Sequence, residues 1–170
     1  MLPKLKTSLI ITLKLDETSH KFFDEQRKKY YPAYANFIDA HLTLFHKLPN
    51  HNEAVMQSIL SLSSVASFTM DVKNIWLKEN FIAYEFTSTI LQQLHLQMQA
   101  ALSIWLSYKD TQLLWPHITI QNKATKYKAY KTHGQLLLQF APFCCTAIGL
   151  TIWEYANKKW TKNIDVPFVG

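Results

Sequence analysis

Two short stretches, "AHLTLFHKLP" at residues 40–49 and "WPHITIQNK" at residues 115–123, decide how this chain is interpreted. Each places a histidine and a threonine two residues apart in a run that is otherwise apolar. Short apolar runs bounded by turn-forming residues are typical of strands that are buried on one side. The repetition of one arrangement in two places predicts two strands that present the same polar chemistry.

Strand geometry decides which of these side chains meet. Successive side chains of a strand point to opposite faces, so His41 and Thr43 share one face, and His117 and Thr119 share one face. The apolar residues between them form the other face, which we expect to lie under a helix. The next side chain on each predicted polar face completes the set: Phe45 on the first strand and Gln121 on the second.

The rest of the chain alternates strand-like and helix-like segments. Further strands are predicted at 7–15, 67–77, 81–87 and in a closing hairpin over 145–168 that turns at 157–158, and the two motif strands span 39–48 and 115–121. Helices are predicted at 19–31, 52–65, 89–107 and 126–140. Pro32 ends the first helix, Ser88 can cap the third, and Gly134 weakens the fourth.

This order predicts an α+β fold in a single domain over residues 1–170. We expect two lobes that divide near residue 88, each an antiparallel sheet with helices packed outside, and both sheets facing a central cleft. Each half of the chain holds one of the two motif strands. The two polar faces would then meet across the cleft.

Composition sets the broad class. The chain has 170 residues, 48% of them hydrophobic, a formal net charge of +6 and only 3 glycines. This composition is globular, favours a polyanionic partner, and argues against a glycine-rich phosphate loop. Cys144 and Cys145 are neighbours and are expected to be reduced, partly buried thiols. No membrane span is evident, and we expect a cytoplasmic protein.

Two imidazoles and two hydroxyls in one cleft suit one kind of chemistry. Imidazole titrates near neutral pH, so one ring can donate a proton while the other accepts one. Hydroxyls can donate hydrogen bonds to the non-bridging oxygens of an anion whose charge is building up. A phosphodiester, whose cleavage needs one proton moved on each side, is the natural substrate, and neither a metal nor a cofactor is required.

The tetrapeptides "HLTL" and "HITI", 76 residues apart, resemble the paired His-x-Thr signatures of the 2H phosphoesterase superfamily, which includes 2′-5′ RNA ligase-like and cyclic phosphodiesterase proteins. The resemblance covers nearly the whole chain and implies two pseudo-symmetric lobes. It implies hydrolysis of 2′,3′-cyclic phosphates, or of related cyclic or 2′-5′ phosphodiesters, in RNA 3′ ends or small nucleotides. It also implies His41 as proton donor, His117 as proton acceptor, and Thr43 and Thr119 as phosphate-binding residues.

Other side chains are weaker candidates. Aromatic rings can stack on a base, and an amide can contact phosphate or base, although strand aromatics more often belong to a core. The candidates for substrate binding are Phe45, Gln121, Trp153 and Tyr155. Of the remaining histidines, His95 is expected to pack in the core. The spacing of five between His41, His46 and His51 fits neither a helix face nor one strand face, so a metal site is not expected there.

Two alternatives to a hydrolase stay open at this point. The same cleft could bind an RNA end or a nucleotide without turning it over. It could also form a 2′-5′ bond by running the same chemistry in reverse. We expect a monomer, and the sequence does not distinguish among the possible substrates.

Overall fold

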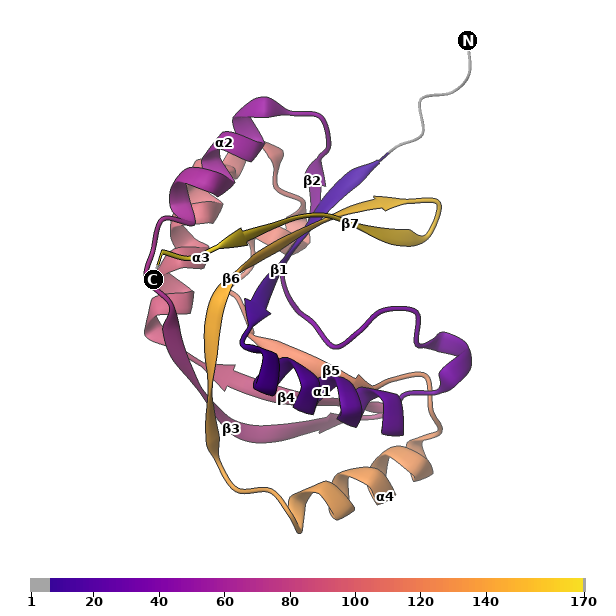
Figure 1. Ribbon diagram of the computed structural model, residues 1–170. Helices are drawn as coiled ribbons and strands as arrows, with labels where there is room; N and C mark the ends of the chain where they lie inside the picture. The colour runs from indigo at the N-terminus through magenta and orange to yellow at the C-terminus, as the bar shows by residue number, and fades with distance from the viewer. Residues whose placement is uncertain (1–6, 170) are drawn as a thin grey trace.

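The computed structural model describes residues 7–169, which form seven β-strands and four α-helices (Figure 1). The strands are β1 (Ser8–Leu15), β2 (Leu42–Pro49), β3 (Phe68–Lys78), β4 (Phe81–Thr87), β5 (His117–Gln121), β6 (Phe143–Ala156) and β7 (Lys159–Pro167). The helices are α1 (Glu17–Tyr30), α2 (Glu53–Leu62), α3 (Thr89–Ala101) and α4 (Lys126–Leu137). Every segment expected from the sequence is present, most of them with shifted ends.

A polar side chain begins each helix by accepting a backbone N–H from the first turn, which would otherwise have no partner. These capping residues are Asp16, Asn52, Ser88 and Thr125. The predicted cap at Ser88 is confirmed, with its Oγ 3.2 Å from the Leu91 nitrogen. Helix α3 ends six residues earlier than 107, because short 3-10 turns replace its last part. None of the helices within residues 7–169 is long and apolar enough to cross a membrane.

All strand pairs in the sheet are antiparallel, in the order β2-β1-β6-β3-β4-β5 with β7 on β6. The predicted mixed class with an antiparallel sheet is confirmed. The prediction of two separate sheets is not confirmed, because the start of β6 pairs with β3 and its remainder pairs with β1 and β7. A strand of 14 residues therefore joins what the sequence suggested were two sheets. Because β6 pairs with strands from the first half of the chain, the pairing does not follow a division at residue 88.

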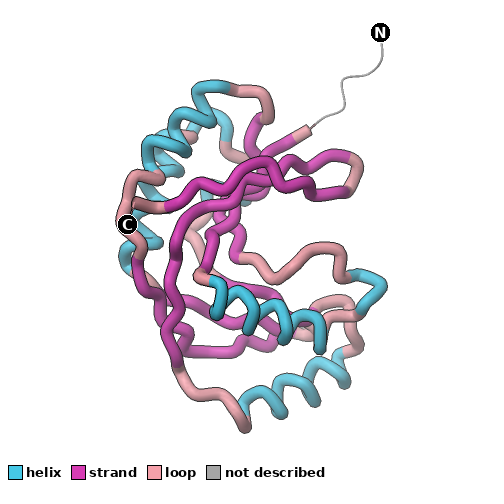
Figure 2. Tube along the Cα trace, in the orientation of Figure 1, coloured by secondary structure: helices cyan, strands magenta, loops and turns pink. Residues whose placement is uncertain are grey.

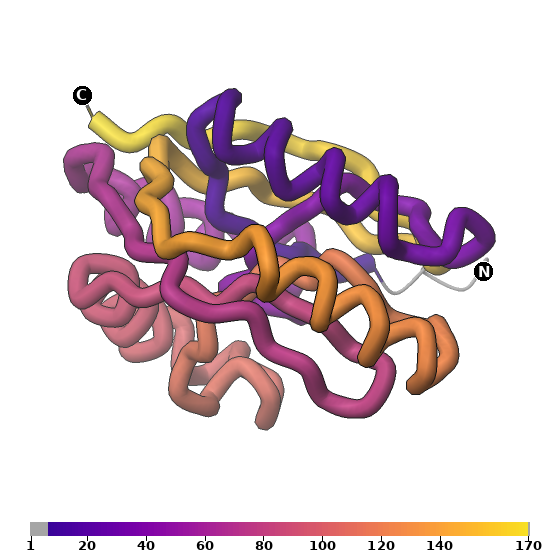
Figure 3. The backbone as a smooth tube through the Cα atoms, turned by 90° about the horizontal axis from the view of Figure 1, so that it is seen from below, coloured from indigo at the N-terminus to yellow at the C-terminus, as the bar shows by residue number. Residues whose placement is uncertain are grey.

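The sheet curves, so its two ends approach one another (Figure 2). Strands β2 and β5 are the last strands at either end of the pairing order, yet their residues lie in contact. Helices α2 and α3 pack together beside one part of the sheet. Helices α1 and α4 run alongside one another beside the other part (Figure 3), and α1 contacts β5. The curvature brings the two motif strands together.

The core is built on an aromatic cluster under α1. Phe23 is fully buried, and its ring lies 5.3 Å from Tyr84, 5.2 Å from Phe86 and 5.9 Å from Phe143. Loss of such a ring typically costs about 3–5 kcal/mol, because a cavity is left behind. This cluster therefore fixes α1 against the sheet. Among the neighbouring strand residues, the β6 cysteines are both free thiols, Cys145 buried and Cys144 exposed.

The two glycines of known environment give a matched test of the sheet. A methyl group at Gly149 would lie 2.5 Å from the Val166 carbonyl oxygen on β7, whereas a methyl group at Gly134 meets nothing within 4 Å. We expect Gly149→Ala to lower the free energy of unfolding by about 1–3 kcal/mol through overpacking. We expect Gly134→Ala to raise it by up to about 1 kcal/mol through helix propensity. Urea unfolding of both variants measures this, and equal effects would contradict the close β6–β7 approach.

Candidate active site

The two motif histidines both stand where their strands begin. His117 is the first residue of β5, and His41 lies one residue before β2 begins, although the sequence had placed it inside the strand. Both rings are partly exposed. They are close enough for a positive charge on His117 to lower the pKa of His41. The contact between β2 and β5 thus assembles one site from segments 76 residues apart.

Both imidazoles are fixed by the same local hydrogen bond. Nδ1 of His41 donates to the Asp39 carbonyl at 2.7 Å, and Nδ1 of His117 donates to the Trp115 carbonyl at 2.7 Å. A carbonyl oxygen can only accept, so the proton of each neutral ring must sit on Nδ1. Each Nε2 therefore carries a lone pair that is available to a proton from outside. This is the tautomer that a general base needs.

Helix α1 braces both motifs from one face. Asp24 accepts the Ala40 N–H at 3.1 Å, directly before His41. Arg27, three residues along the same helix, donates to the Thr119 carbonyl at 2.7 Å. Residues three apart are neighbours on a helix surface, so one turn of α1 holds a backbone group of each motif. Arg27 is only 5% exposed, and its charge stays next to the site.

Burial lowers the pKa of both histidines. For His41 the desolvation of the charged ring dominates and brings its pKa to about 4, with the charges of Arg27 and His117 acting in the same direction. For His117 burial again dominates, Lys109 adds to it, and Glu85 opposes it. The hydrogen bonds to Asp39 and Trp115 oppose both shifts. Without an anion in the site, both rings are neutral at pH 7.

A β-bulge follows each motif and overturns two predictions. The pairing of β1 with β2 skips Leu44, and the pairing of β4 with β5 skips Ile120. An extra residue reverses the alternation of faces beyond it. Phe45 is consequently fully buried and stacks on His95, with ring centres 4.7 Å apart. Gln121 is also fully buried.

The prediction that Phe45 and Gln121 face the substrate is therefore wrong, because both side chains point into the core. The prediction assumes strict alternation along each strand, and the extra residue at the bulge breaks that alternation. The amide of Gln121 has no hydrogen-bond partner among residues 7–169, which is unusual for a buried polar group. His95 packs in the core as expected, with Nε2 3.1 Å from the Leu44 carbonyl.

Two cavities open next to the histidines. One, of about 420 Å³, is lined by His41, Thr12 and Trp153 among others. The other, of about 210 Å³, is lined by His117, Thr43, His46 and Lys109 among others. The structure thus places Thr43 beside His117 in one cavity. Thr119 is half-buried on β5 and does not line either cavity.

Aromatic rings flank both imidazoles. The Trp160 ring lies 5.0 Å from His41, and the Trp115 ring stacks on His117 at 4.2 Å. Trp153 lines the His41 cavity, where its Nε1 donates to Thr12 Oγ1 at 2.9 Å. Tyr155 is half-buried and lines neither cavity. Trp153 and Trp160 lie edge to face beside His41, with their ring centres 6.0 Å apart.

Sequence reasoning missed four residues of this site. Asp24 and Arg27 look like ordinary helix-surface charges, and only burial marks them as structural. Trp160 was hidden in the predicted hairpin, although the pairing of Tyr155 with Trp160 follows from the correctly predicted turn. His46 stands five residues after His41, a spacing that the bulge makes meaningful. Within residues 7–169 no group of three or more His, Cys, Asp or Glu side chains is placed to hold a metal ion.

Comparisons with known proteins place this geometry in context. A family model described as the 2′-5′ RNA ligase superfamily matches residues 15–159. The crystal structure of E. coli LigT complexed with 3′-AMP is similar at 15% identity, with a TM-score of 0.58, 96% of this chain and 99% of that chain covered. The crystal structure of TT0787 of Thermus thermophilus is similar at 14% identity, with a TM-score of 0.57, 95% and 97% covered. No curated protein sequence matches the chain.

The depressed pKa of His41 is measurable by NMR. We expect its ring to stay neutral until the pH falls to about 4, because burial opposes the charged form. In the unfolded chain an ordinary histidine protonates near pH 6.5, so its contribution to stability is present above that pH and is lost as the pH falls towards about 4. His41→Asn identifies the resonance and should show a shallower loss of stability over this window. Titration of the His41 ring near pH 6.5 would contradict the burial argument.

Proposed function

This chain belongs to the 2′-5′ RNA ligase superfamily, which confirms the resemblance to the 2H phosphoesterases, and from that premise we propose that it is a phosphodiesterase that opens 2′,3′-cyclic phosphates. The observation that carries the proposal is the pair of imidazoles on touching edge strands, each with Nδ1 occupied by a carbonyl and Nε2 free. Two such groups supply both proton transfers that the reaction needs. RNA 3′ ends or small nucleotides are the proposed substrates.

In the proposed reaction His117 Nε2 takes a proton from water while the water oxygen attacks phosphorus. The bond from phosphorus to O3′ breaks, and His41 Nε2 gives a proton to the departing oxygen. The product is a 2′-phosphate with a free 3′-hydroxyl, and one water has been consumed. The Thr43 hydroxyl, in the cavity with His117, donates to a non-bridging oxygen, where negative charge builds up during the attack. We propose the same role for Thr119 from the matching position of β5. Solvent then removes the proton from His117 and protonates His41 again.

The charge of the substrate completes the site. With a pKa of about 4, His41 is almost entirely unprotonated at pH 7 in the empty site and is therefore a poor proton donor. An anionic phosphate between the rings favours the imidazolium, because an opposite charge a few ångströms away stabilises it. The acid form of His41 is thus acquired with the substrate. Burial, aided by the charge of Arg27, keeps the His41 ring neutral in the empty site.

The ligands of a structural relative are compatible with this substrate class. LigT of E. coli has been crystallised with 3′-AMP, with NADP+, with phosphate and with ATP. Each ligand carries phosphate, and all but one of them are nucleotides. For this chain we take from that only the expectation that the histidine-lined cavities accept a phosphorylated nucleoside.

The central test uses an oligoribonucleotide that ends in a 2′,3′-cyclic phosphate, with EDTA present. We expect the wild type to open it to the 2′-phosphate, and His41→Ala and His117→Ala each to lose about 10²–10⁴-fold in kcat, the usual contribution of one acid or base. His51→Asn, at an exposed loop position with positive φ that asparagine tolerates, is the control. Product analysis by chromatography distinguishes opening from ligation.

Two outcomes would overturn the proposal. Full activity in the His41→Ala, His117→Ala double variant would show that the imidazoles are not the acid and base. Tight binding with the cyclic phosphate recovered unchanged would indicate a binding module instead.

A sulfur substitution tests which histidine is the acid. A substrate whose 3′ leaving oxygen is replaced by sulfur needs no proton donor, because a thiolate leaves unaided. With His41 as donor, His41→Ala should recover most of its lost rate on this analogue, and His117→Ala should not. The reverse pattern would exchange the two roles. Glu85 favours that exchange, because it opposes the fall in the pKa of His117 and so favours the protonated ring that an acid needs. Single-turnover rates on both substrates give the answer.

A further inference from the structure

Strand β2 carries a third polar side chain on the side of the cavities, and the proposed reaction does not use it. Because the bulge at Leu44 turns Phe45 into the core, the next residue, His46, points out of the core beyond Thr43. Its ring is exposed, and it lines the cavity of about 210 Å³ together with Thr43 and His117. His46 thus belongs to the same row as the first motif.

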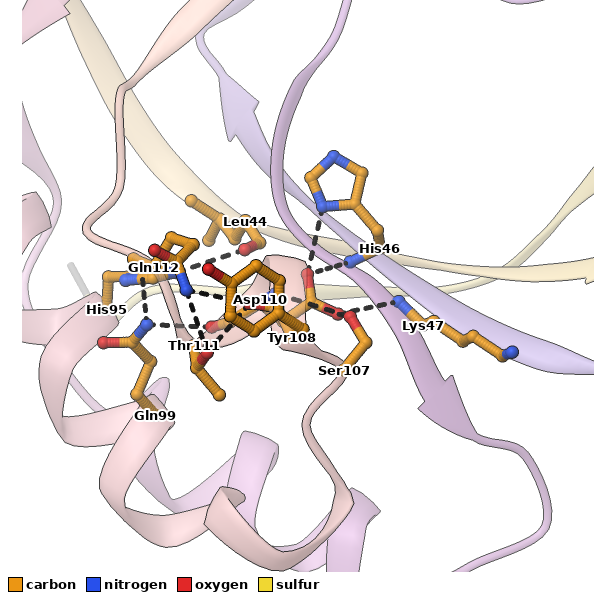
Figure 4. A network of polar contacts seen from close by, with 10 residues as sticks. All are labelled: Leu44, His46, Lys47, His95, Gln99, Ser107, Tyr108, Asp110, Thr111 and Gln112. Carbon is orange, nitrogen blue, oxygen red and sulfur yellow. Dashed lines mark hydrogen bonds and ion pairs between the residues drawn. The ribbon is translucent and has the colours of Figure 1, made fainter.

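A buried carboxylate fixes this histidine (Figure 4). Asp110 is 3% exposed and accepts three hydrogen bonds. They come from the His46 and Lys47 backbone nitrogens at 2.8 and 3.2 Å and from Ser107 Oγ at 2.7 Å. Its Oδ1 also lies 3.0 Å from His46 Nδ1. An ionised carboxylate only accepts, so Nδ1 carries the proton. Figure 4 shows the other ring nitrogen directed away from this network.

The cavity around His46 suits an anion. Lys109 lines it, as do His46 and His117. Asp110 is the one acidic residue in its lining, and its hydrogen bonds to His46, Lys47 and Ser107 already occupy that carboxylate. A phosphate oxygen there would meet an ammonium group and an imidazole held in place, the charge-assisted contacts that phosphate prefers.

We propose that His46 and Lys109 bind a second phosphate of the substrate, the one carried on O5′ of the nucleotide whose cyclic phosphate is opened. The assignment rests on the proposed function, with the reacting phosphate held at Thr43. With the bulge counted, Thr43 and His46 are two ladder positions apart, which is about 7 Å along the strand and suits neighbouring phosphates of one nucleotide. The equivalent position after the second motif is Asn122, whose carboxamide is bonded to the Lys123 nitrogen. Only one side of the site is therefore built for the second phosphate.

The test compares three substrates: a nucleoside 2′,3′-cyclic phosphate, the same compound with a 5′-phosphate, and a dinucleotide ending in the cyclic phosphate. In His46→Asn the carboxamide can replace the Nδ1 donor to Asp110 but offers nothing in place of Nε2. We expect its KM for the 5′-phosphorylated substrate to rise about 10- to 100-fold more than its KM for the unphosphorylated substrate, the equivalent of one hydrogen bond to a charged group.

Lys109→Ala should show the same selective rise in KM, and any effect it has through the pKa of His117 should be equal on all three substrates. Lys131→Ala, on an exposed position of α4, should have no effect. A change confined to the 5′-monoester assigns the site to mononucleotides. A change that includes the dinucleotide assigns it to RNA ends. Equal changes on all three substrates, or no change on any, would overturn the inference while leaving the proposed hydrolysis intact.

Failure of the wild type to open any of the three would instead count against the proposed function. The subsite is then tested by calorimetry with a nucleoside 3′,5′-bisphosphate and the matching 3′-monophosphate. Tighter binding of the bisphosphate by the wild type, lost in His46→Asn, supports the subsite without any turnover. Equal affinity for the two ligands overturns it.

Discussion

One turn of helix α1 holds the two halves of the site in register. Asp24 accepts the backbone N–H that precedes His41, and Arg27 donates to the carbonyl of Thr119. Arg27 also donates to Asn36 Oδ1 at 2.8 Å and lies over the Tyr31 ring. A buried guanidinium is costly unless its donors are used, and a hydrogen bond to a charged group contributes about 1.5–3 kcal/mol. The two motifs are therefore tied to a single rigid element, which is itself anchored by Phe23 in the core.

The second constraint is the shared backbone irregularity of the motif strands. Each strand bulges at the residue after its threonine, and each histidine donates Nδ1 to the carbonyl two residues before it. The bulge interrupts the polar row and turns the next side chain into the core. The local structure of the site is thus nearly two-fold symmetric, although the sheet that carries it is continuous. Asymmetry enters through the neighbours: Glu85 lies near His117, and Arg27 lies near His41.

Electrostatics and shape act together in this arrangement. Burial keeps both imidazoles neutral, and nearby cations keep the surroundings favourable to an anion. A phosphate that enters reverses this balance, because it stabilises the charged form of the ring beside it. Trp115 and Trp160 flank the two rings and limit their exposure to water. We therefore expect phosphate binding and protonation of the histidine beside it to occur together.

The sequence by itself determined the class of the fold, its helices and strands, and the two His-x-Thr pairs, because these depend on periodicity and on residues close in the chain. The turn at 157–158 and the cap at Ser88 are local in the same way. Only the tertiary structure decided that β6 makes one sheet of two, that Phe45 and Gln121 are buried, and that Asp24, Arg27 and His46 reach the site. A bulge depends on the partner strand, and burial depends on what packs above, so neither is encoded in the spacing of one segment.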